Sequence, residues 1–132
     1  MTAHEIILRR AYDARAGVHA RTNPHGAQLL VDRLWPRGIA KTELPIDAWL
    51  KELTPSTALR KWFGHDPAKW DTFRSRYLAE LNAHPKAVEQ ALEWCRRGEV
   101  TLLSGAKDTS HTHAIILRDF LTEQLDQETP NA

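Results

Sequence analysis

The sequence Gln28-Leu29-Leu30-Val31-Asp32-Arg33 contains an apolar run that follows turn residues and ends in charge. This pattern predicts a buried strand over residues 28–33. A second run, Val100-Thr101-Leu102-Leu103-Ser104, predicts another strand near the end of the chain. Helical patterns fill the interval between the two runs, so we expect the strands to be parallel neighbours joined by a helical crossover. The predicted fold class is therefore α/β.

Turn residues and hydrophobic spacing predict the remaining elements. Residues 5–10 favour a first strand, whose direction relative to the strand at 28–33 the sequence leaves open. Helices are expected over five stretches, which are 45–53, 57–63, 67–81, 85–97 and 112–125. Together these elements predict one small Rossmann-like domain over residues 1–126, with an open sheet of few, mainly parallel strands flanked by helices. Residues 127–132 are expected to form a frayed tail.

Composition excludes several classes of protein. The chain has 132 residues, 27% charged and 42% hydrophobic, which is typical of one globular domain. Eighteen Lys and Arg residues against seventeen Asp and Glu residues give a net charge of +1, which argues neither for nor against a polyanionic partner. Cys95 is the only cysteine, which excludes an intrachain disulfide. The sequence contains no apolar run of membrane length and no secretory signal, so we expect a cytosolic location and no membrane partner.

Two polar loops are expected at the carboxyl ends of the predicted strands. One is Asp32-Arg33-Leu34-Trp35-Pro36-Arg37-Gly38, and the other covers residues 105–113. Ligands of open α/β sheets bind beyond these strand ends, and the start of the last helix adds N–H groups that favour an anion. We therefore expect both loops to line one anion-binding cleft. The predicted ligand-binding residues are Arg33, Trp35, Arg37, His65 and Lys107, and the catalytic candidates are Asp32, Asp108 and His113.

Several of these residues also fit a structural role. Asp32 is equally compatible with an internal ion-pair network, and Trp35 with a packed anchor for its loop. His65 lies at a predicted helix junction, where a histidine is exposed by default. His111 and His113 are two positions apart, which is not the same-face spacing of a helical metal site, so no metal site is predicted. The sequence leaves the cofactor unknown.

Four stretches resemble a known family. The most specific are Leu30-Val31-Asp32-Arg33-Leu34-Trp35-Pro36-Arg37-Gly38 and Leu59-Arg60-Lys61-Trp62-Phe63-Gly64-His65-Asp66-Pro67, and residues 49–57 and 100–114 agree with them. The chain resembles the YeaO-like branch of a bacterial domain-of-unknown-function family over residues 6–121. The resemblance implies a small cytosolic α/β protein without an assigned activity. A more distant branch carries a cysteine near the end of the last strand, where this chain has Ser104, which argues against a cysteine-nucleophile mechanism here.

Three functions are consistent with the sequence. The first is a cleft for an anionic small molecule, phosphate- or nucleotide-like, in a binding protein or an enzyme. The second is a nucleic-acid module whose basic loops follow phosphates while Trp35 and Trp62 stack on bases, although a net charge of +1 disfavours strong nonspecific binding. The third is a protein-interaction domain that uses exposed tryptophans. The sequence leaves the reaction type and the oligomeric state open.

Overall fold

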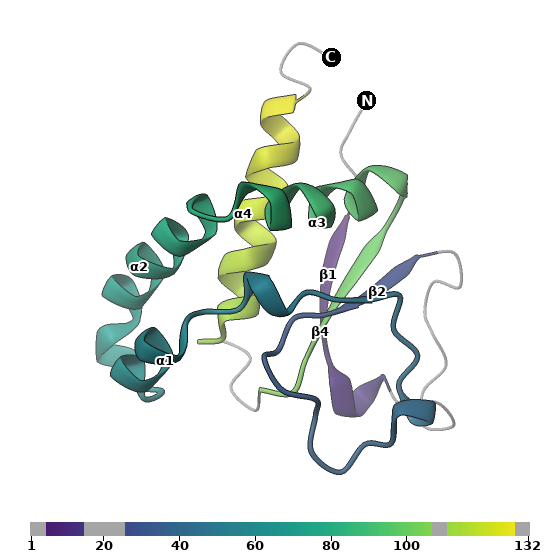
Figure 1. Ribbon diagram of the computed structural model, residues 1–132, viewed down its shortest axis with the longest axis horizontal. Coiled ribbons are helices and arrows are strands. Elements are labelled where there is room, and N and C mark those ends of the chain that lie inside the picture. Colours follow the sequence, from purple (N-terminus) through teal and green to yellow (C-terminus); the bar gives the residue numbers. More distant parts are fainter. Residues whose placement is uncertain (1–4, 15–25, 107–110, 129–132) are drawn as a thin grey trace.

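The computed structural model describes residues 5–14, 26–106 and 111–128. At its centre is a sheet formed by β1 (Ile6–Arg10), β2 (Ala27–Leu30), β3 (Ala48–Trp49) and β4 (Val100–Ser104). The strand order is β1-β4-β2-β3, and every neighbouring pair is parallel. β4 lies between β1 and β2 and pairs with both, so the first two strands are parallel without being neighbours (Figure 1). The predicted α/β fold with mainly parallel strands is confirmed.

The predicted helical crossover joins β2 to β4. It contains α1 (Thr57–Phe63), α2 (Trp70–Asn82) and α3 (Pro85–Arg97). The pairing of β2 with β4 ends at Leu30 opposite Leu103, and the Val31 amide still donates to the Leu103 carbonyl at 3.0 Å. β2 therefore stops before Asp32, whereas the sequence predicts a strand to residue 33. The chain leaves the strand there because the Asp32 side chain bonds across to the end of β4.

The segment after Pro45 is a short strand and a turn, so the prediction of a helix over residues 45–53 is wrong. Ala48 and Trp49 pair with β2, and a 3-10 turn follows at Lys51–Leu53. The physical reason lies in the open edge of β2, whose backbone groups need partners. The Asp47 amide donates to the Gln28 carbonyl at 2.7 Å, and the Leu50 amide donates to the Leu30 carbonyl at 2.8 Å. These bonds add β3 to the sheet as the edge strand beside β2.

The four α-helices of the described residues lie on one side of the sheet and share one apolar core with it (Figure 1). The last of them is α4 (His113–Glu128), which follows β4. The larger apolar core joins strand residues such as Leu29 and Leu102 to helix residues such as Tyr77 and Leu117. Among the described residues, no helix is long and apolar enough to cross a membrane. The expected cytosolic location stays a prediction.

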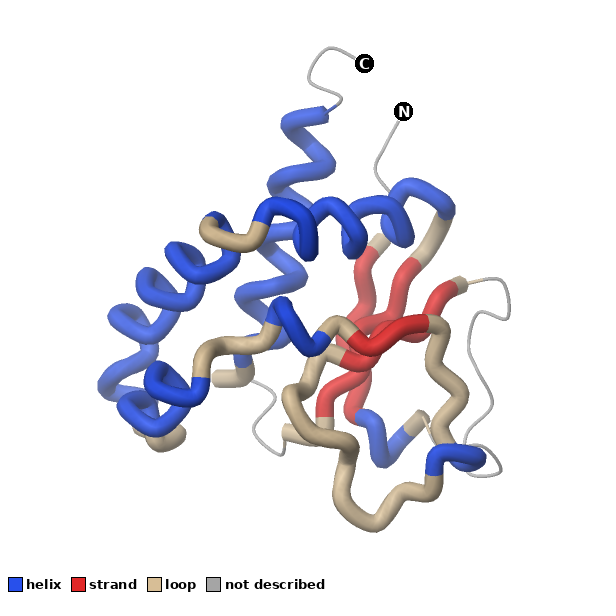
Figure 2. The backbone as a smooth tube through the Cα atoms, viewed as in Figure 1, coloured by secondary structure: helices blue, strands red, loops and turns tan. Residues whose placement is uncertain are grey.

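The opposite face of the sheet carries a smaller apolar core. It contains Ala11, Ala14, Leu30, Ile39, Leu44 and Leu103, with Trp35 and Trp49 packed against it. Its cover is the connection from β2 to β3, which runs beside the sheet as a long loop (Figure 2). Pro36, Gly38 and Pro45 break helical structure in this connection. In the described part of the chain the helices therefore flank one face, whereas a doubly wound Rossmann sheet carries helices on both.

The helix α4 continues through Gln127 and Glu128, where the sequence predicts a frayed tail. Arg96 on α3 donates to the Glu128 carboxylate from Nε at 3.0 Å and from Nη2 at 2.6 Å. The same guanidinium holds the pKa of the Glu128 carboxyl below its usual value. This contact fastens the last turn of α4 to α3, and the rest of the predicted tail, 129–132, lies outside the described residues.

Candidate functional site

A cleft of about 850 Å³ opens at the carboxyl ends of β2 and β4. Its walls are the loop after β2, the helix α1 with the residues around it, and the residues that lead into α4. Six of the eight predicted site residues line it, which are Asp32, Arg33, Trp35, Arg37, His65 and His113. Lys107 and Asp108 lie outside the described residues. The two loops therefore meet at one place, as far as the described residues go, and the ligand roles of these side chains stay predictions.

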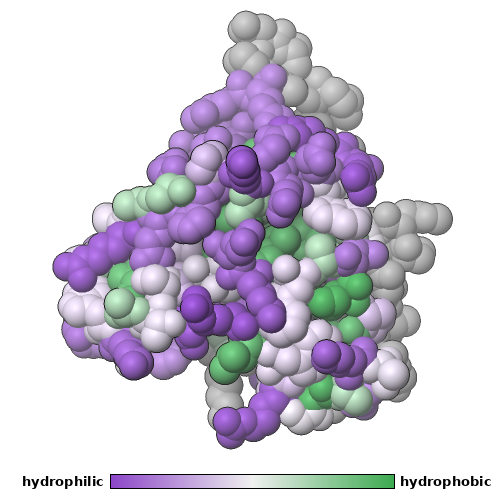
Figure 3. Space-filling view, viewed as in Figure 1, coloured by the Kyte–Doolittle hydropathy of each residue, from purple (hydrophilic) through white to green (hydrophobic). Residues whose placement is uncertain are grey.

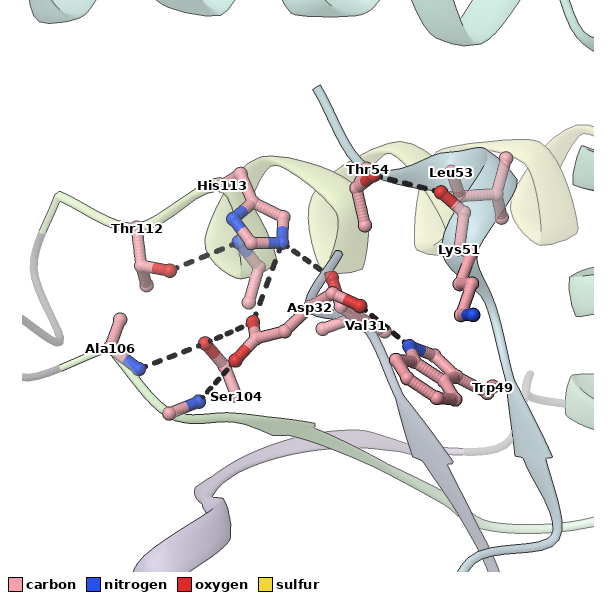
Figure 4. Close-up of polar contacts among 12 residues, drawn as sticks. Val31, Asp32, Trp49, Lys51, Leu53, Thr54, Ser104, Ala106, Thr112 and His113 are labelled. Atoms are coloured by element: carbon pink, nitrogen blue, oxygen red, sulfur yellow. Dashed lines mark hydrogen bonds and ion pairs between the residues drawn. The ribbon is translucent and has the colours of Figure 1, made fainter. Parts of the chain in front are cut away.

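The carboxylate of Asp32 is bound to the end of β4 (Figure 4). The Ser104 hydroxyl donates to Oδ1 at 2.9 Å, and the Gly105 amide donates to Oδ2 at 2.6 Å. The Ala106 amide in turn donates to the Ser104 hydroxyl at 3.2 Å. Glycine at position 105 suits this close approach, because a Cβ there would lie 3.3 Å from Asp32 Oδ2, closer than most such contacts, and the carboxylate would have to shift. Both carboxylate oxygens are thus occupied by partners within the protein.

The backbone next to Asp32 is held from two further elements. His113 Nε2, on α4, donates to the Val31 carbonyl at 2.6 Å. Trp49 Nε1, on β3, donates to the Asp32 carbonyl at 2.6 Å. Side-chain bonds from β3, β4 and α4 therefore converge on residues 31 and 32 (Figure 4). These bonds restrain the backbone at residues 31 and 32, so the loop that carries Arg33 leaves the sheet from a fixed point beside the cleft.

The ring of His113 is enclosed by protein on most sides. Its side chain is 18% exposed, and it packs edge-on against the Tyr77 ring at a centroid distance of 6.0 Å. Burial is the largest influence and lowers the pKa of the His113 imidazole. The Val31 carbonyl and the Asp32 carboxylate, 3.9 Å from Nε2, oppose this effect, whereas the positive charge of Arg60 adds to it. The pKa of His113 is lowered overall, so the ring is neutral at neutral pH.

Four cationic side chains line the cleft, which are Arg33, Arg37, Arg60 and Lys61. None of the four forms a salt bridge with a carboxylate in the ranges that the structure describes. Asp32 is the one carboxylate among the described lining residues. Four cations against one carboxylate leave the described part of the cleft with an excess of positive charge that is available to a ligand.

Trp35 has the structural role that the sequence left open, and it also lines the cleft. Its Nε1 donates to the Ile39 carbonyl at 2.6 Å, and its ring meets Trp49 edge-on at 5.7 Å. These contacts anchor the loop after β2.

Trp62 is not among the residues that line the cleft. Its ring instead packs against two cations, with Lys69 Nζ at 5.0 Å and the Arg76 guanidinium at 4.4 Å from its centroid.

His65 lies in an unusual backbone conformation at the edge of the cleft. Its φ of 57° is positive, which among the described residues other than glycine occurs here alone. Gly64 before it ends α1 with a φ of 55°, so two consecutive residues are left-handed. A side chain in this region costs about 1 kcal/mol or more, and such residues concentrate at functional sites. The conformation places the exposed imidazole 6.2 Å from the Phe63 ring.

Sequence reasoning missed two cations of the site, Arg60 and Lys61. Both lie on α1, which approaches the strand ends because β3 and its turn lead the chain back to the cleft. The sequence predicted a helix in place of β3, so the position of α1 relative to β2 could not be deduced. One signal was present, since both residues belong to the specific family stretch at 59–67.

Metal and thiol chemistry find little support in this cleft. Within the described ranges no three His, Cys, Asp or Glu side chains are grouped as metal ligands. Cys95 is fully buried in the core, away from the cleft, and burial raises the pKa of its thiol to about 11. A thiol in that environment stays protonated and unreactive at neutral pH.

Comparisons with known proteins identify the family of this chain. Residues 5–132 match the family model described as the inactive DUF488-N3 subclade. The chain belongs to this family. It is 48% identical to the uncharacterized protein YeaO of Escherichia coli K12 over 96 residues, which cover 73% of this chain and 84% of the relative. The proposed resemblance to the YeaO-like branch is therefore confirmed.

Relatives of this family also occur in mycobacteria. The uncharacterized proteins Mb3100c of Mycobacterium bovis and Rv3073c of Mycobacterium tuberculosis are each 35% identical to this chain over 96 residues. The aligned region covers 73% of this chain and 80% of each relative. No solved structure matches the chain.

Proposed function

We propose that the cleft binds an anionic small molecule, and that the protein is a binding protein rather than an enzyme. The observation that carries this proposal is the positive charge of Arg33, Arg37, Arg60 and Lys61 around one cleft, without a carboxylate partner among the described residues. Guanidinium groups suit phosphate and carboxylate oxygens because they offer two N–H donors in a fixed geometry. Asp32 is the one carboxylate among the described lining residues, and its two oxygens accept hydrogen bonds from Ser104 and Gly105 rather than from these cations.

The size of the cleft favours an anion attached to an organic group. Its volume of about 850 Å³ lies within the range of roughly 300–1,000 Å³ typical of small-molecule sites. A bare phosphate would leave most of this space filled with water. The rings of Tyr12, Trp35 and Phe63 border the cleft and supply apolar surface beside the cations. A phosphate ester such as a nucleoside monophosphate matches this combination of charge and ring surface.

Two observations favour binding over catalysis. Ser104 is 7% exposed and its hydroxyl donates to Asp32, so the hydroxyl is not presented to a ligand as a nucleophile. The description of the matching family as an inactive subclade agrees with this interpretation. The catalytic roles of Asp32, Asp108 and His113 stay predictions, and an enzyme that uses the same cleft is the alternative.

The two other functions have weaker support. A nucleic-acid module would need free tryptophan faces, whereas Trp35 is packed on Trp49 and Trp62 lies against Lys69 and Arg76. A protein-interaction domain would need a continuous apolar patch. Leu34, at 71% exposure, is the one large hydrophobic residue that the described residues leave exposed. Hydrophobic residues on the face in Figure 3 form separate patches among hydrophilic ones.

Isothermal titration of the full chain tests the proposal. The ligands are inorganic phosphate, sulfate and AMP at low ionic strength, since salt screens such contacts. We expect saturable binding of all three, with AMP the tightest. Loss of one cleft cation removes on the order of 1 kcal/mol, so Arg60→Gln or Lys61→Gln should weaken binding about fivefold.

Matched variants outside the cleft provide the controls. Arg97→Gln and Lys86→Gln remove the same charges from α3, at residues that do not line the cleft. Their affinities should stay within about twofold of the unmodified chain. Equal weakening by cleft and control variants would mean that the anions respond to overall charge, and the proposed site would be rejected.

A further inference from the structure

The hydrogen bond to the Val31 carbonyl determines which nitrogen of His113 can gain a proton. A carbonyl oxygen only accepts, so the hydrogen of the neutral ring lies on Nε2, 2.6 Å from that oxygen. Nδ1 is therefore the titrating atom. Nδ1 has no hydrogen-bond partner among the described residues. The His113 side chain is 18% exposed, and His113 lines the cleft.

Protonation of the His113 ring depends on the charged groups that surround it. From the loop after β2, the Asp32 carboxylate lies 3.9 Å from Nε2 and favours the charged ring. From α1, the positive charge of Arg60 opposes it. From α2, the ring of Tyr77 packs against the imidazole, and burial raises the pKa of its phenol, so it stays neutral. At the end of β4, the described residues Ser104 and Gly105 present neutral groups.

We infer that anion binding in the cleft is coupled to the uptake of one proton by His113 Nδ1. The inference rests on the proposed function. A bound anion neutralises Arg60, which removes the repulsion that now opposes the charged ring. The anion also supplies an acceptor for the new Nδ1–H group. Linkage is reciprocal, so a proton that is easier to bind in the complex makes the anion bind more tightly in mild acid.

The expected pH dependence follows from this linkage. With one proton taken up per anion, affinity changes by at most about tenfold per pH unit between the pKa values of the free and the complexed imidazole. In the free protein the pKa of His113 lies below 6.5. We therefore expect sulfate to bind about tenfold more tightly near pH 5.5 than near pH 8. Sulfate is the right probe because it remains a dianion over this range.

The experiment combines nuclear magnetic resonance with a conservative variant. The His113 ring signal is titrated with acid in sulfate and in chloride at equal ionic strength, and sulfate affinity is measured at both pH values. His113→Gln keeps an N–H donor for the Val31 carbonyl but has no titrating atom. His84→Gln is the matched control, because His84 is exposed and does not line the cleft.

Each outcome of this experiment either supports or overturns the coupling of anion binding to His113 protonation. Support is a His113 titration that moves to higher pH in sulfate, with a pH-dependent affinity that His113→Gln flattens and His84→Gln preserves. Sulfate binding that leaves the His113 titration unmoved overturns the inference and leaves the proposed function standing. The same holds if the pH dependence survives in His113→Gln, since His65 or His111 would then be the proton site. Absence of saturable sulfate binding at both pH values overturns the proposed function and this inference together.

Discussion

Asp32→Asn removes one negative charge from the cleft while keeping the size of the side chain. Asparagine can direct Oδ1 to the Gly105 amide and Nδ2 to the Ser104 hydroxyl, so both contacts at 2.6 and 2.9 Å remain but become neutral. A hydrogen bond to a charged group contributes roughly 1.5–3 kcal/mol and a neutral one roughly 0.5–1.5 kcal/mol. The two bonds together lose about 2 kcal/mol. Water reaches the Asp32 side chain, which is 21% exposed, and this reduces the expected loss to about 1.5 kcal/mol.

Urea unfolding measures this loss, and anion titration gives a second, independent result. The control is Asp126→Asn, the same chemical change at an exposed position of α4 without a described partner, and it should cost less than about 0.5 kcal/mol. Asp32→Asn should also bind sulfate more tightly than the unmodified chain, because the cleft then loses its one described carboxylate.

Two results would refute this reasoning. A loss of stability equal to that of Asp126→Asn would mean that the bonds from Ser104 and Gly105 contribute nothing to the charged form. Weaker sulfate binding in a stable Asp32→Asn variant would mean that the carboxylate contacts the ligand or its counterion. The second result would restore Asp32 as a catalytic or ligand-binding candidate.

Four further changes have defined outcomes. His65→Gly relieves the positive φ of 57° and should raise the free energy of unfolding by about 0.5–1 kcal/mol in urea, while it weakens AMP binding. Gly105→Ala brings a Cβ to 3.3 Å from Asp32 Oδ2, so the carboxylate has to shift, and the free energy of unfolding should fall by about 1 kcal/mol in the same assay. His113 has a folded pKa below 6.5, so stability present above pH 6.5 should fall as pH decreases to that folded pKa, and His113→Gln should remove this slope from urea titrations. Glu128→Gln breaks the charged contact with Arg96 and should speed amide exchange in the last turn of α4.

The elements that could be predicted are those whose signals are local. Ser56 caps α1 by accepting from the Leu59 amide, and Asp66 begins the next helical segment by accepting from the Ala68 amide. The strands β2 and β4 were predictable because their apolar runs are buried on both faces of the sheet. β3 was not, since two residues carry no periodicity. Its existence depends on the free backbone groups of β2, which only the assembled sheet provides.

The same distinction applies to the site. That the loops after β2 and β4 meet follows from the parallel sheet, because carboxyl ends of neighbouring parallel strands lie at one edge. The bond from Ser104 to Asp32 depends on the register of those strands, which could not be deduced from their two apolar runs alone. The position of His113 against Val31 requires in addition the direction from which α4 leaves the strand ends. The sequence alone therefore could not decide whether Asp32 and His113 are structural partners within the protein or groups that contact a ligand.

The distribution of charge shows most clearly why the candidate site could not be identified without the folded structure. Over the whole chain, acidic and basic residues nearly cancel at +1, which argues for no particular partner. Folding separates them: Glu89 and Glu128 pair with Arg96 away from the cleft, while Asp32 bonds to neutral donors at its base. What remains at the strand ends is a set of cations without a described acid partner. An anion that binds there gains from this local excess, and the near-neutral total keeps long-range attraction to polyanions weak.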